Sequence, residues 1–175
     1  MEPGFLVASP QMRDANFHRT VVLLLHHDAE GAMGVVVNRE SAVRLADVLD
    51  QLGGMPPVRL GGHVLWGGPV ERAAGFVVFR GRAPEGWQVR MDLSVSASTE
   101  RLAALVATNA EFHLCLGYAG WGPGQLEREV VEGSWVHVDA TSNLIFDVPA
   151  SERYDAALSR LGLTPDTLWM SPIDE

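Results

Sequence analysis

The stretch from Glu111 to Val131 constrains the fold most, because an alternating pattern gives way there to a helical one across a run of glycines. Apolar side chains occupy every second position from 112 to 118, which is typical of a strand with one face in the core. The glycines that follow predict a tight bend with little side-chain bulk. They are Gly117, Gly120, Gly122 and Gly124. We expect this strand, its bend and the helix after it to form the centre of the fold.

The residues after the bend predict a helix. Pro123 suits its first position, where a missing N–H is not needed, and Gln125 can reach back to cap the opening turn. Leu126 and Val130 lie four residues apart and predict an inward-facing side, and Gly133 ends the helix. We interpret the bend as a close-packing element on which any recognition function is built.

An alternative function for the bend is phosphate binding through the free N–H groups of the helix start. Gly117 and Gly122 have the spacing of the two glycines in a P-loop. However, Pro123 and Gly124 stand where that motif requires Lys and Ser or Thr, and glutamates follow. The pattern therefore favours a structural bend.

The composition indicates a globular, acidic chain. Of its 175 residues, 47% are hydrophobic and 20% are charged, which predicts one folded domain over residues 1–175. Thirteen basic and 22 acidic residues give a net charge of −9, which repels phosphate backbones. Nucleic acid is therefore an unfavoured partner.

The single cysteine, Cys115, excludes an intrachain disulfide and fits a reducing compartment. The first residues lack the basic segment of a signal peptide, and the longest aliphatic run, 21–25, is too short to span a membrane. These features predict a cytoplasmic protein without a membrane partner.

The remaining pattern consists of runs of short strands interrupted by single helices. Strands are predicted at 5–8, 20–27, 33–38, 63–66, 75–79, 87–91, 112–118, 135–138 and 144–148. Besides the helix after the bend, helices are predicted from Ser41 to Leu52, from Ser98 or Thr99, and from Ser151 to Gly162, with a last turn at Thr164-Pro165. This order favours a mixed sheet in an α+β fold.

Several motifs, taken in this order, carry a resemblance to a known family. They are residues 4–10 (GFLVASP), Asp14 with residues 17–22, residues 31–39 (GAMGVVVNR), 67–70 (GGPV), 75–76 (GF), 116–121 (LGYAGW) and 124–127 (GQLE). On these residues the chain resembles the YqgE/AlgH family of small bacterial proteins. The resemblance implies an α+β fold whose mixed, bifurcated sheet includes a small barrel, surrounded by three to five helices, in a cytosolic protein.

The resemblance implies less about activity. One branch of the family is linked to regulation of gene expression in exopolysaccharide production. The family has no established biochemical activity and no agreed catalytic residues to transfer to this sequence.

Two groups of residues are candidates for chemistry. His26, His27 and Asp28 are possible metal ligands, but in a strand only His26 and Asp28 share a face, and two ligands do not complete a zinc site. Cys115 and His113, two apart on one face, resemble an activated thiolate pair, whereas a free cysteine is more often a small buried hydrophobe. We therefore predict no catalytic residues, no metal and no cofactor.

Other residues are candidates for recognition. Arg19 can hold a carboxylate or phosphate through two hydrogen bonds, or form an ion pair with Asp14 or Glu30. Trp121 is either an exposed anchor for a partner or a plug at one end of the sheet.

These observations favour a non-enzymatic regulatory or interaction module that binds a protein or small molecule. The predicted binding surface comprises Arg19, Asn38, Gly68, Tyr118, Gly120, Trp121 and Gln125. The first alternative is a hydrolase or transferase that uses Cys115 and His113, or the histidines near Asp28. The second is a direct DNA-binding regulator, which the net charge disfavours. The oligomeric state is not determined by the sequence.

Overall fold

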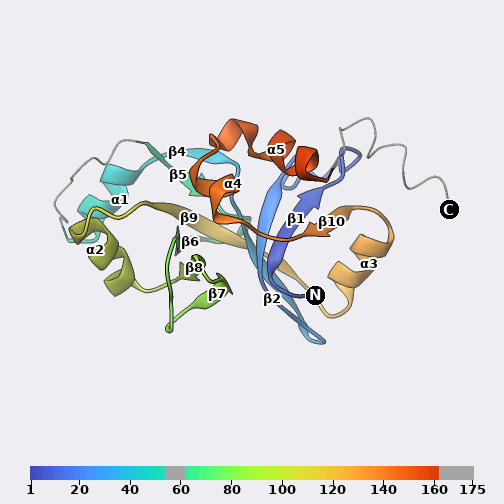
Figure 1. Cartoon of the computed structure of the whole chain (residues 1–175), viewed down its shortest axis with the longest axis horizontal. Helices are drawn as coiled ribbons and strands as arrows, with labels where there is room; N and C mark the ends of the chain where they lie inside the picture. The colour runs from blue at the N-terminus through green and yellow to red at the C-terminus, as the bar shows by residue number, and fades with distance from the viewer. Residues whose placement is uncertain (54–61, 162–175) are drawn as a thin grey trace.

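The computed structural model describes residues 1–53 and 62–161 and is built around one long strand, β9 (Figure 1). Over these residues the strands form one ten-stranded sheet. The strands are β1 (Gly4–Ala8), β2 (Val21–Asp28), β3 (Gly31–Val36), β4 (Glu40–Arg44), β5 (His63–Trp66), β6 (Val70–Phe79), β7 (Trp87–Arg90), β8 (Leu93–Ser96), β9 (Phe112–Trp121) and β10 (Trp135–Val138). The helices are α1 (Leu45–Gln51), α2 (Thr99–Ala107), α3 (Gln125–Val131), α4 (Ser142–Phe146) and α5 (Arg153–Arg160), with a 3₁₀ turn, η1 (Ala150–Glu152).

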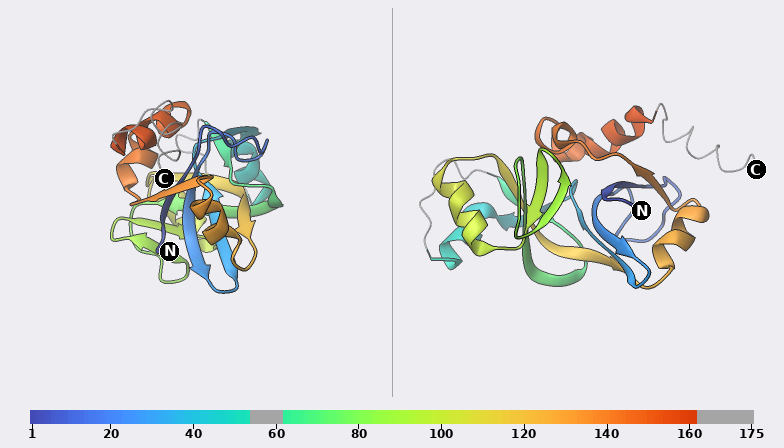
Figure 2. Two further views of the ribbon diagram at one scale, coloured as in Figure 1. Left: turned by 90° about the vertical axis from the view of Figure 1, so that its right-hand side faces the viewer. Right: turned by 60° about the horizontal axis from the view of Figure 1, so that its bottom comes forward.

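The sheet branches at β9. The main path runs β10-β1-β2-β3-β9-β6-β8-β7, while β5 also pairs with β9 and carries β4 at its side. The β5·β9 pair is parallel and the other pairs are antiparallel. Seen from below, β9 passes from one half of the molecule into the other (Figure 2). The predicted α+β class with a mixed, bifurcated sheet is confirmed, but the pairing among the described strands closes no barrel.

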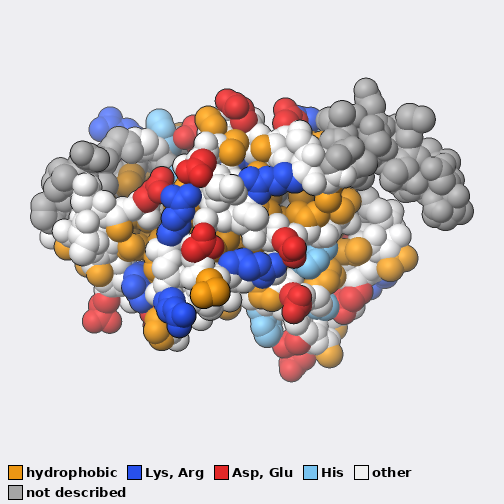
Figure 3. Space-filling model, in the orientation of Figure 1, with side chains coloured by type: hydrophobic (Ala, Val, Ile, Leu, Met, Phe, Trp, Pro, Cys, Tyr) orange, Lys and Arg blue, Asp and Glu red, His pale blue; other side chains and the backbone are white. Residues whose placement is uncertain are grey.

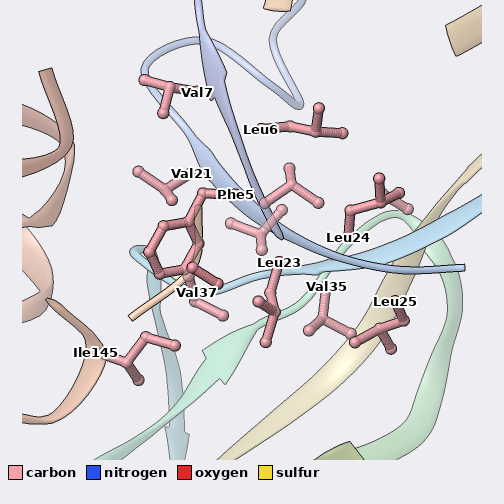
Figure 4. Packing of buried hydrophobic residues seen from close by; sticks show 14 of the residues in the cluster. Phe5, Leu6, Val7, Val21, Leu23, Leu24, Leu25, Val35, Val37 and Ile145 are labelled. Atoms are coloured by element: carbon pink, nitrogen blue, oxygen red, sulfur yellow. The ribbon is translucent and has the colours of Figure 1, made fainter. Parts of the chain in front are cut away.

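The larger core lies where β1, β2 and β3 pack side by side. Residues 21–24 are fully buried, as expected for a strand covered on both faces. Figure 4 shows Phe5 and Val37 facing Ile145, which α4 contributes from across the core. Leu126 of α3 is also fully buried. Burial of each such side chain contributes roughly 1.5–3 kcal/mol.

A smaller core lies under α1 and α2 at the other end of the sheet. Leu102, Leu105 and Val106 pack there against Val77 and Phe79 of β6. The predicted start of α2 is confirmed, because the Ser98 side chain accepts a hydrogen bond from the Arg101 N–H.

One predicted strand and two predicted helix starts are wrong. Ser41 lies in β4, donates to the Val64 carbonyl at 2.7 Å, and does not cap a helix. Helix α1 begins only at Leu45. The predicted strand 144–148 falls largely within α4, whose Leu144 and Ile145 are both buried. Ser151 lies in η1, before α5 begins. In all three places tertiary contacts override local pattern.

The glycine bend is shorter than predicted. Strand β9 continues through Gly117 and Gly120 to Trp121, so only residues 122–124 turn the chain. Pro123 therefore precedes the helix, and Gly124 is its N-cap in a left-handed conformation. Gln125 reaches back as predicted, accepting a hydrogen bond from the Gly122 N–H at 2.9 Å.

One strand of the sheet was not predicted, and two predictions fall on residues that the structure does not describe. Strand β8 has no counterpart among the predicted strands. The predicted helix end at Gly162 and the turn at Thr164-Pro165 lie outside the described residues. Within the described part of the chain, no helix has both the length and the apolar character needed to cross a membrane.

Candidate functional site

A cavity of about 360 Å³ is lined by η1 and the start of α5 together with β4, β5 and β9. Five elements contribute polar side chains to its lining: β4, β5, β9, η1 and α5. These side chains are Glu40, His63, His113, Ser151 and Arg153. The volume is at the small end of the roughly 300–1,000 Å³ typical of small-molecule pockets.

Arg153 is the charged group at the base of this cavity and is only 3% exposed. Its Nε donates to the Val148 carbonyl at 2.9 Å, and its Nη1 donates to the Val37 carbonyl at 2.6 Å. Its Nη2 lies 3.2 Å from Nε2 of His113. The guanidinium is therefore held between α5, the end of β3 and the middle of the sheet.

No carboxylate among the described residues forms an ion pair with Arg153. Burial lowers its pKa, and the nearby Cys115 and Glu40 act in the opposite direction. An arginine side chain nevertheless stays protonated in proteins. A buried positive charge without a paired anion costs several kcal/mol of desolvation. The cavity therefore has a strong electrostatic preference for a negative ligand.

His113 is the second polar group of the cavity interior and is half-buried. Burial, followed by the charge of Arg153, lowers its pKa to about 4, so the ring is neutral at physiological pH. Its Nε2 lies 3.2 Å from both Arg153 Nη2 and the Ile145 carbonyl. Because the guanidinium only donates, Nε2 accepts from Arg153 only when the ring proton is on Nδ1. The ring also stacks on Phe146, with centroids 5.3 Å apart.

The cavity wall is mixed in character, with an apolar part inside and an exposed polar rim. Leu65 and Leu114 are buried side chains of β5 and β9, and Leu45, Phe112 and Pro149 complete the apolar lining. Glu40, His63 and Ser151 lie at the exposed rim. A ligand that reaches Arg153 thus passes polar groups at the opening and rests against hydrocarbon inside.

Cys115 does not supply a nucleophile to this site. It is fully buried, and burial raises the pKa of its thiol to about 12. The reactive species of a cysteine is the thiolate, which is negligible at neutral pH under these conditions. The predicted alternative of a thiolate activated by His113 therefore lacks its essential group.

The seven residues of the predicted binding surface fall into three separate groups. Gly68 is buried against the Tyr118 backbone, and the exposed Gly120 follows on β9. Tyr118 is half-buried, and its hydroxyl donates to Glu71 at 3.1 Å. None of these residues lines the Arg153 cavity.

Arg19 and Asn38 form the second group. The Asn38 side chain accepts from the Val21 N–H at 2.8 Å and donates to the Arg19 carbonyl at 2.9 Å. Arg19 pairs with Asp155 at 3.1 Å and lies over the Tyr154 ring at 4.6 Å. The predicted pairing of Arg19 with Asp14 or Glu30 is therefore wrong, because α5 brings an acid from the other end of the chain.

Trp121 and Gln125 form the third group, joined by Glu129. Trp121 is 6% exposed, so it packs in the core and is not an exposed anchor. One Glu129 oxygen accepts from the indole N–H groups of Trp121 and Trp135, each at 3.0 Å, and the other accepts from Gln125 at 2.9 Å. These contacts fasten α3 to the sheet.

The histidines near Asp28 are divided as the strand geometry predicts. His26 Nε2 lies 2.8 Å from an Asp28 oxygen, whereas His27 turns inward, 3.1 Å from Glu127. Its Nε2 is buried and has no partner with hydrogen-bond geometry. Across the part of the chain that the structure describes, no three His, Cys, Asp or Glu side chains are placed to hold a metal.

Sequence reasoning did not identify Arg153 or Glu129. A signal for Arg153 was present, because it lies four residues before Ala157 on the helix face that also carries buried residues. Glu129 had no comparable signal, since its partners lie on other elements.

The fold and cavity together define a small α+β protein with a branched sheet and a buried arginine beside a polar pocket. The model of the AlgH-like family matches residues 5–166 of this chain. The chain therefore belongs to the AlgH-like family.

Individual relatives agree with this assignment. A UPF0301 protein of Anaeromyxobacter sp. (strain K) is 43% identical over 177 residues, covering 94% of this chain and 90% of the relative. A UPF0301 protein of Pseudomonas aeruginosa is 42% identical, covering 91% of this chain and 87% of the relative. The chain is thus similar to both over nearly their entire lengths.

Solved structures share the fold. The solution structure of the AlgH protein from Pseudomonas aeruginosa superposes with a TM-score of 0.77 at 38% identity, covering 97% of this chain and 93% of that one. A crystal structure of a Corynebacterium diphtheriae protein gives a TM-score of 0.72 at 24% identity, covering 91% and 87%. At that identity the second likeness concerns the fold alone.

Proposed function

We propose that this protein is a non-catalytic regulatory module that binds a small anion in the cavity at Arg153. The observation that carries the proposal is a 3% exposed guanidinium beside a cavity of about 360 Å³, with no carboxylate partner among the described residues. An anion that entered the cavity would offset the desolvation cost of this charge. Binding of this kind would connect α5 to β9 through the ligand.

The burial of Cys115 supports a binding function over a catalytic one. The thiol is 0% exposed, and its pKa of about 12 leaves it protonated. His113 is neutral, and its Nε2 lies within hydrogen-bond distance of Arg153. The ring is therefore better placed to hold the guanidinium in position than to act as a general base for a thiol. We also propose a cytoplasmic location, because the lone free cysteine fits a reducing compartment.

We expect the module to act on gene expression through a protein or small-molecule partner and not by binding DNA. Acidic and basic side chains alternate across the face shown in Figure 3, without a continuous basic stripe. Several arginines are paired with acids: Arg80 with Glu111 and Asp147, and Arg101 with Glu85. Such pairs reduce the positive potential that DNA binding requires.

The surface around Tyr118 is the proposed contact for a protein partner. Tyr118 is half-buried and Gly120 is exposed, and a Cβ added to Gly120 would lie 3.8 Å from the Tyr118 ring. Substitution Tyr118→Ala should weaken capture of a partner from a bacterial extract while leaving the unfolding midpoint within a few degrees. Unchanged capture would remove this surface from the proposal.

The anion site is tested by titrating the full chain with acetate and, separately, with inorganic phosphate, and by following backbone amide signals by NMR. At least one of these anions should shift His113 and Ser151, and Arg153→Lys should weaken binding because it removes two of five N–H donors. Arg128→Lys, an exposed position on α3, is the matched control and should bind as the wild type does. Absence of any Arg153-dependent shift at tens of millimolar anion would reject the proposal.

A further inference from the structure

We infer that the natural ligand of the Arg153 cavity is a small monocarboxylate with an apolar body, and not a phosphate. The inference rests on the proposed anion-binding function and specifies its ligand. It follows from three features of the cavity: the donors that Arg153 has left, the charge of the surroundings, and the nature of the wall.

The first feature is the number of free donors. A guanidinium has five N–H groups. Carbonyl oxygens accept from one on Nε and one on Nη1, and His113 Nε2 accepts from one on Nη2 when the ring proton is on Nδ1. One N–H on each terminal nitrogen is left over. Two N–H groups match the two oxygens of a carboxylate, which arginine binds with paired hydrogen bonds. A phosphate would keep at least one of its oxygens without a donor from this residue.

The second feature is the low positive charge of the site. Among the described residues that line the cavity, Arg153 is the single permanent cation, since the pKa of His113 is lowered to about 4 and the ring is neutral. Glu40 at the rim adds a negative charge. A monoanion neutralises Arg153 without excess charge, whereas a phosphate with close to two negative charges would be left under-compensated and repelled by Glu40.

The third feature is the apolar wall. Leu65 and Leu114 are buried in the cavity wall, and Leu45 and Phe112 lie beside them. Hydrocarbon against this wall gains about 25 cal/mol per Å² of buried apolar surface, which phosphate oxygens do not. This apolar part of the mixed wall therefore favours a carboxylate that carries an aliphatic or aromatic group.

The experiment compares four probes on the full chain by calorimetry and NMR: isocaproate, its neutral amide isocaproamide, leucine and inorganic phosphate. Isocaproate should bind with the highest affinity and should shift His113, Leu114 and Ser151. Isocaproamide should bind about tenfold or more weakly, because it lacks the charge that strengthens hydrogen bonds to Arg153. Leucine should also bind more weakly, since its ammonium group must lose water beside the buried guanidinium.

Two variants place the binding in the cavity. Arg153→Lys should reduce isocaproate affinity about tenfold or more. Ser151→Trp should block the opening from an exposed position that the core does not use, so that loss of binding occurs in a folded protein. The dispersion of the amide spectrum verifies folding of each variant.

The outcomes separate this inference from the proposed function. Phosphate that binds more tightly than isocaproate, in a manner dependent on Arg153, would overturn the carboxylate inference and leave the anion site standing. Leucine that binds more tightly than isocaproate, with the advantage lost in Glu40→Gln, would overturn it in favour of an amino acid. Equal affinity for isocaproamide would also overturn it, and failure of all four probes to bind would reject the anion site itself.

Discussion

A Cβ atom added to Gly117 would lie 2.3 Å from the carbonyl oxygen of Gly68, so that the backbones of β9 and of the segment after β5 touch with no room for a side chain. The contact is reciprocal, since a Cβ on Gly68 would lie 2.1 Å from the Tyr118 carbonyl. This is the place where the sheet branches. Gly117 on β9 and Gly68 after β5 therefore permit the close approach of the two backbones on which the branch depends.

Substitution Gly117→Ala should destabilise the protein by more than about 3 kcal/mol, because it combines the backbone clash with a positive φ of 84°. Gly124→Ala is the matched control. Gly124 also has a positive φ, 73°, but no atom lies within 4 Å of an added Cβ, so only the conformational cost of about 1–2 kcal/mol applies. Urea unfolding measures both; equal losses would show that the close approach is unimportant.

Cys115 should be unreactive in the native protein. Because burial raises the pKa of its thiol to about 12 and leaves it 0% exposed, a thiol reagent at pH 8 should label it only when the chain unfolds. The labelling rate, followed by mass spectrometry, should rise by several orders of magnitude in denaturing urea. Rapid labelling without urea would restore a thiol-based activity as a hypothesis.

His113 should make the folded state sensitive to acid. Its pKa falls from an ordinary 6.5 to about 4 on folding, so the unfolded chain takes up a proton first as the pH decreases. The folded state therefore loses stability as the pH falls from about 6.5 towards 4, by up to about 3 kcal/mol from this group.

The variant His113→Gln tests this assignment, because glutamine does not titrate and retains an oxygen that accepts from Arg153. We expect a smaller dependence of the free energy of unfolding on pH between 4 and 6.5 than in the wild type, whose His113 pKa is lowered to about 4. The measurement is urea unfolding at several pH values. An unchanged pH profile would contradict a buried neutral His113.

Glu129, a half-buried residue of a short helix, should be important for stability. Replacing it with alanine leaves the indole N–H groups of Trp121 and Trp135 without their acceptor, each at a cost of about 1–3 kcal/mol. Glu129→Ala should therefore lower the free energy of unfolding by about 2–4 kcal/mol and change the tryptophan emission. The exposed Glu132→Ala on the same helix end should change neither quantity appreciably.

Local pattern determined much of the fold. The buried strands β1 and β2, the cap of α2 and the turn at Gly133 follow from residues close together in the sequence, whose spacing and capping chemistry act locally. The motif resemblance supplied the branched sheet. Where a segment had to satisfy distant partners, as at Ser41 and Leu144, the local pattern predicted the wrong element.

The candidate site was decided by the tertiary structure. Cys115 and His113 lie two residues apart on one strand, yet their pKa values depend first on burial by other segments of the chain. The charge of Arg153, 40 residues after His113, further lowers the His113 pKa. Likewise, the sequence left open whether Trp121 lies on the surface or in the core. Its contacts with Glu129 and Trp135, which come from later in the chain, place it in the core. The sequence alone determined most of the buried strands and the position of the glycine bend, because those depend on near neighbours. Burial, and with it the charge state of each group, was decided only when the chain folded, because solvent exclusion requires segments far apart in sequence to meet.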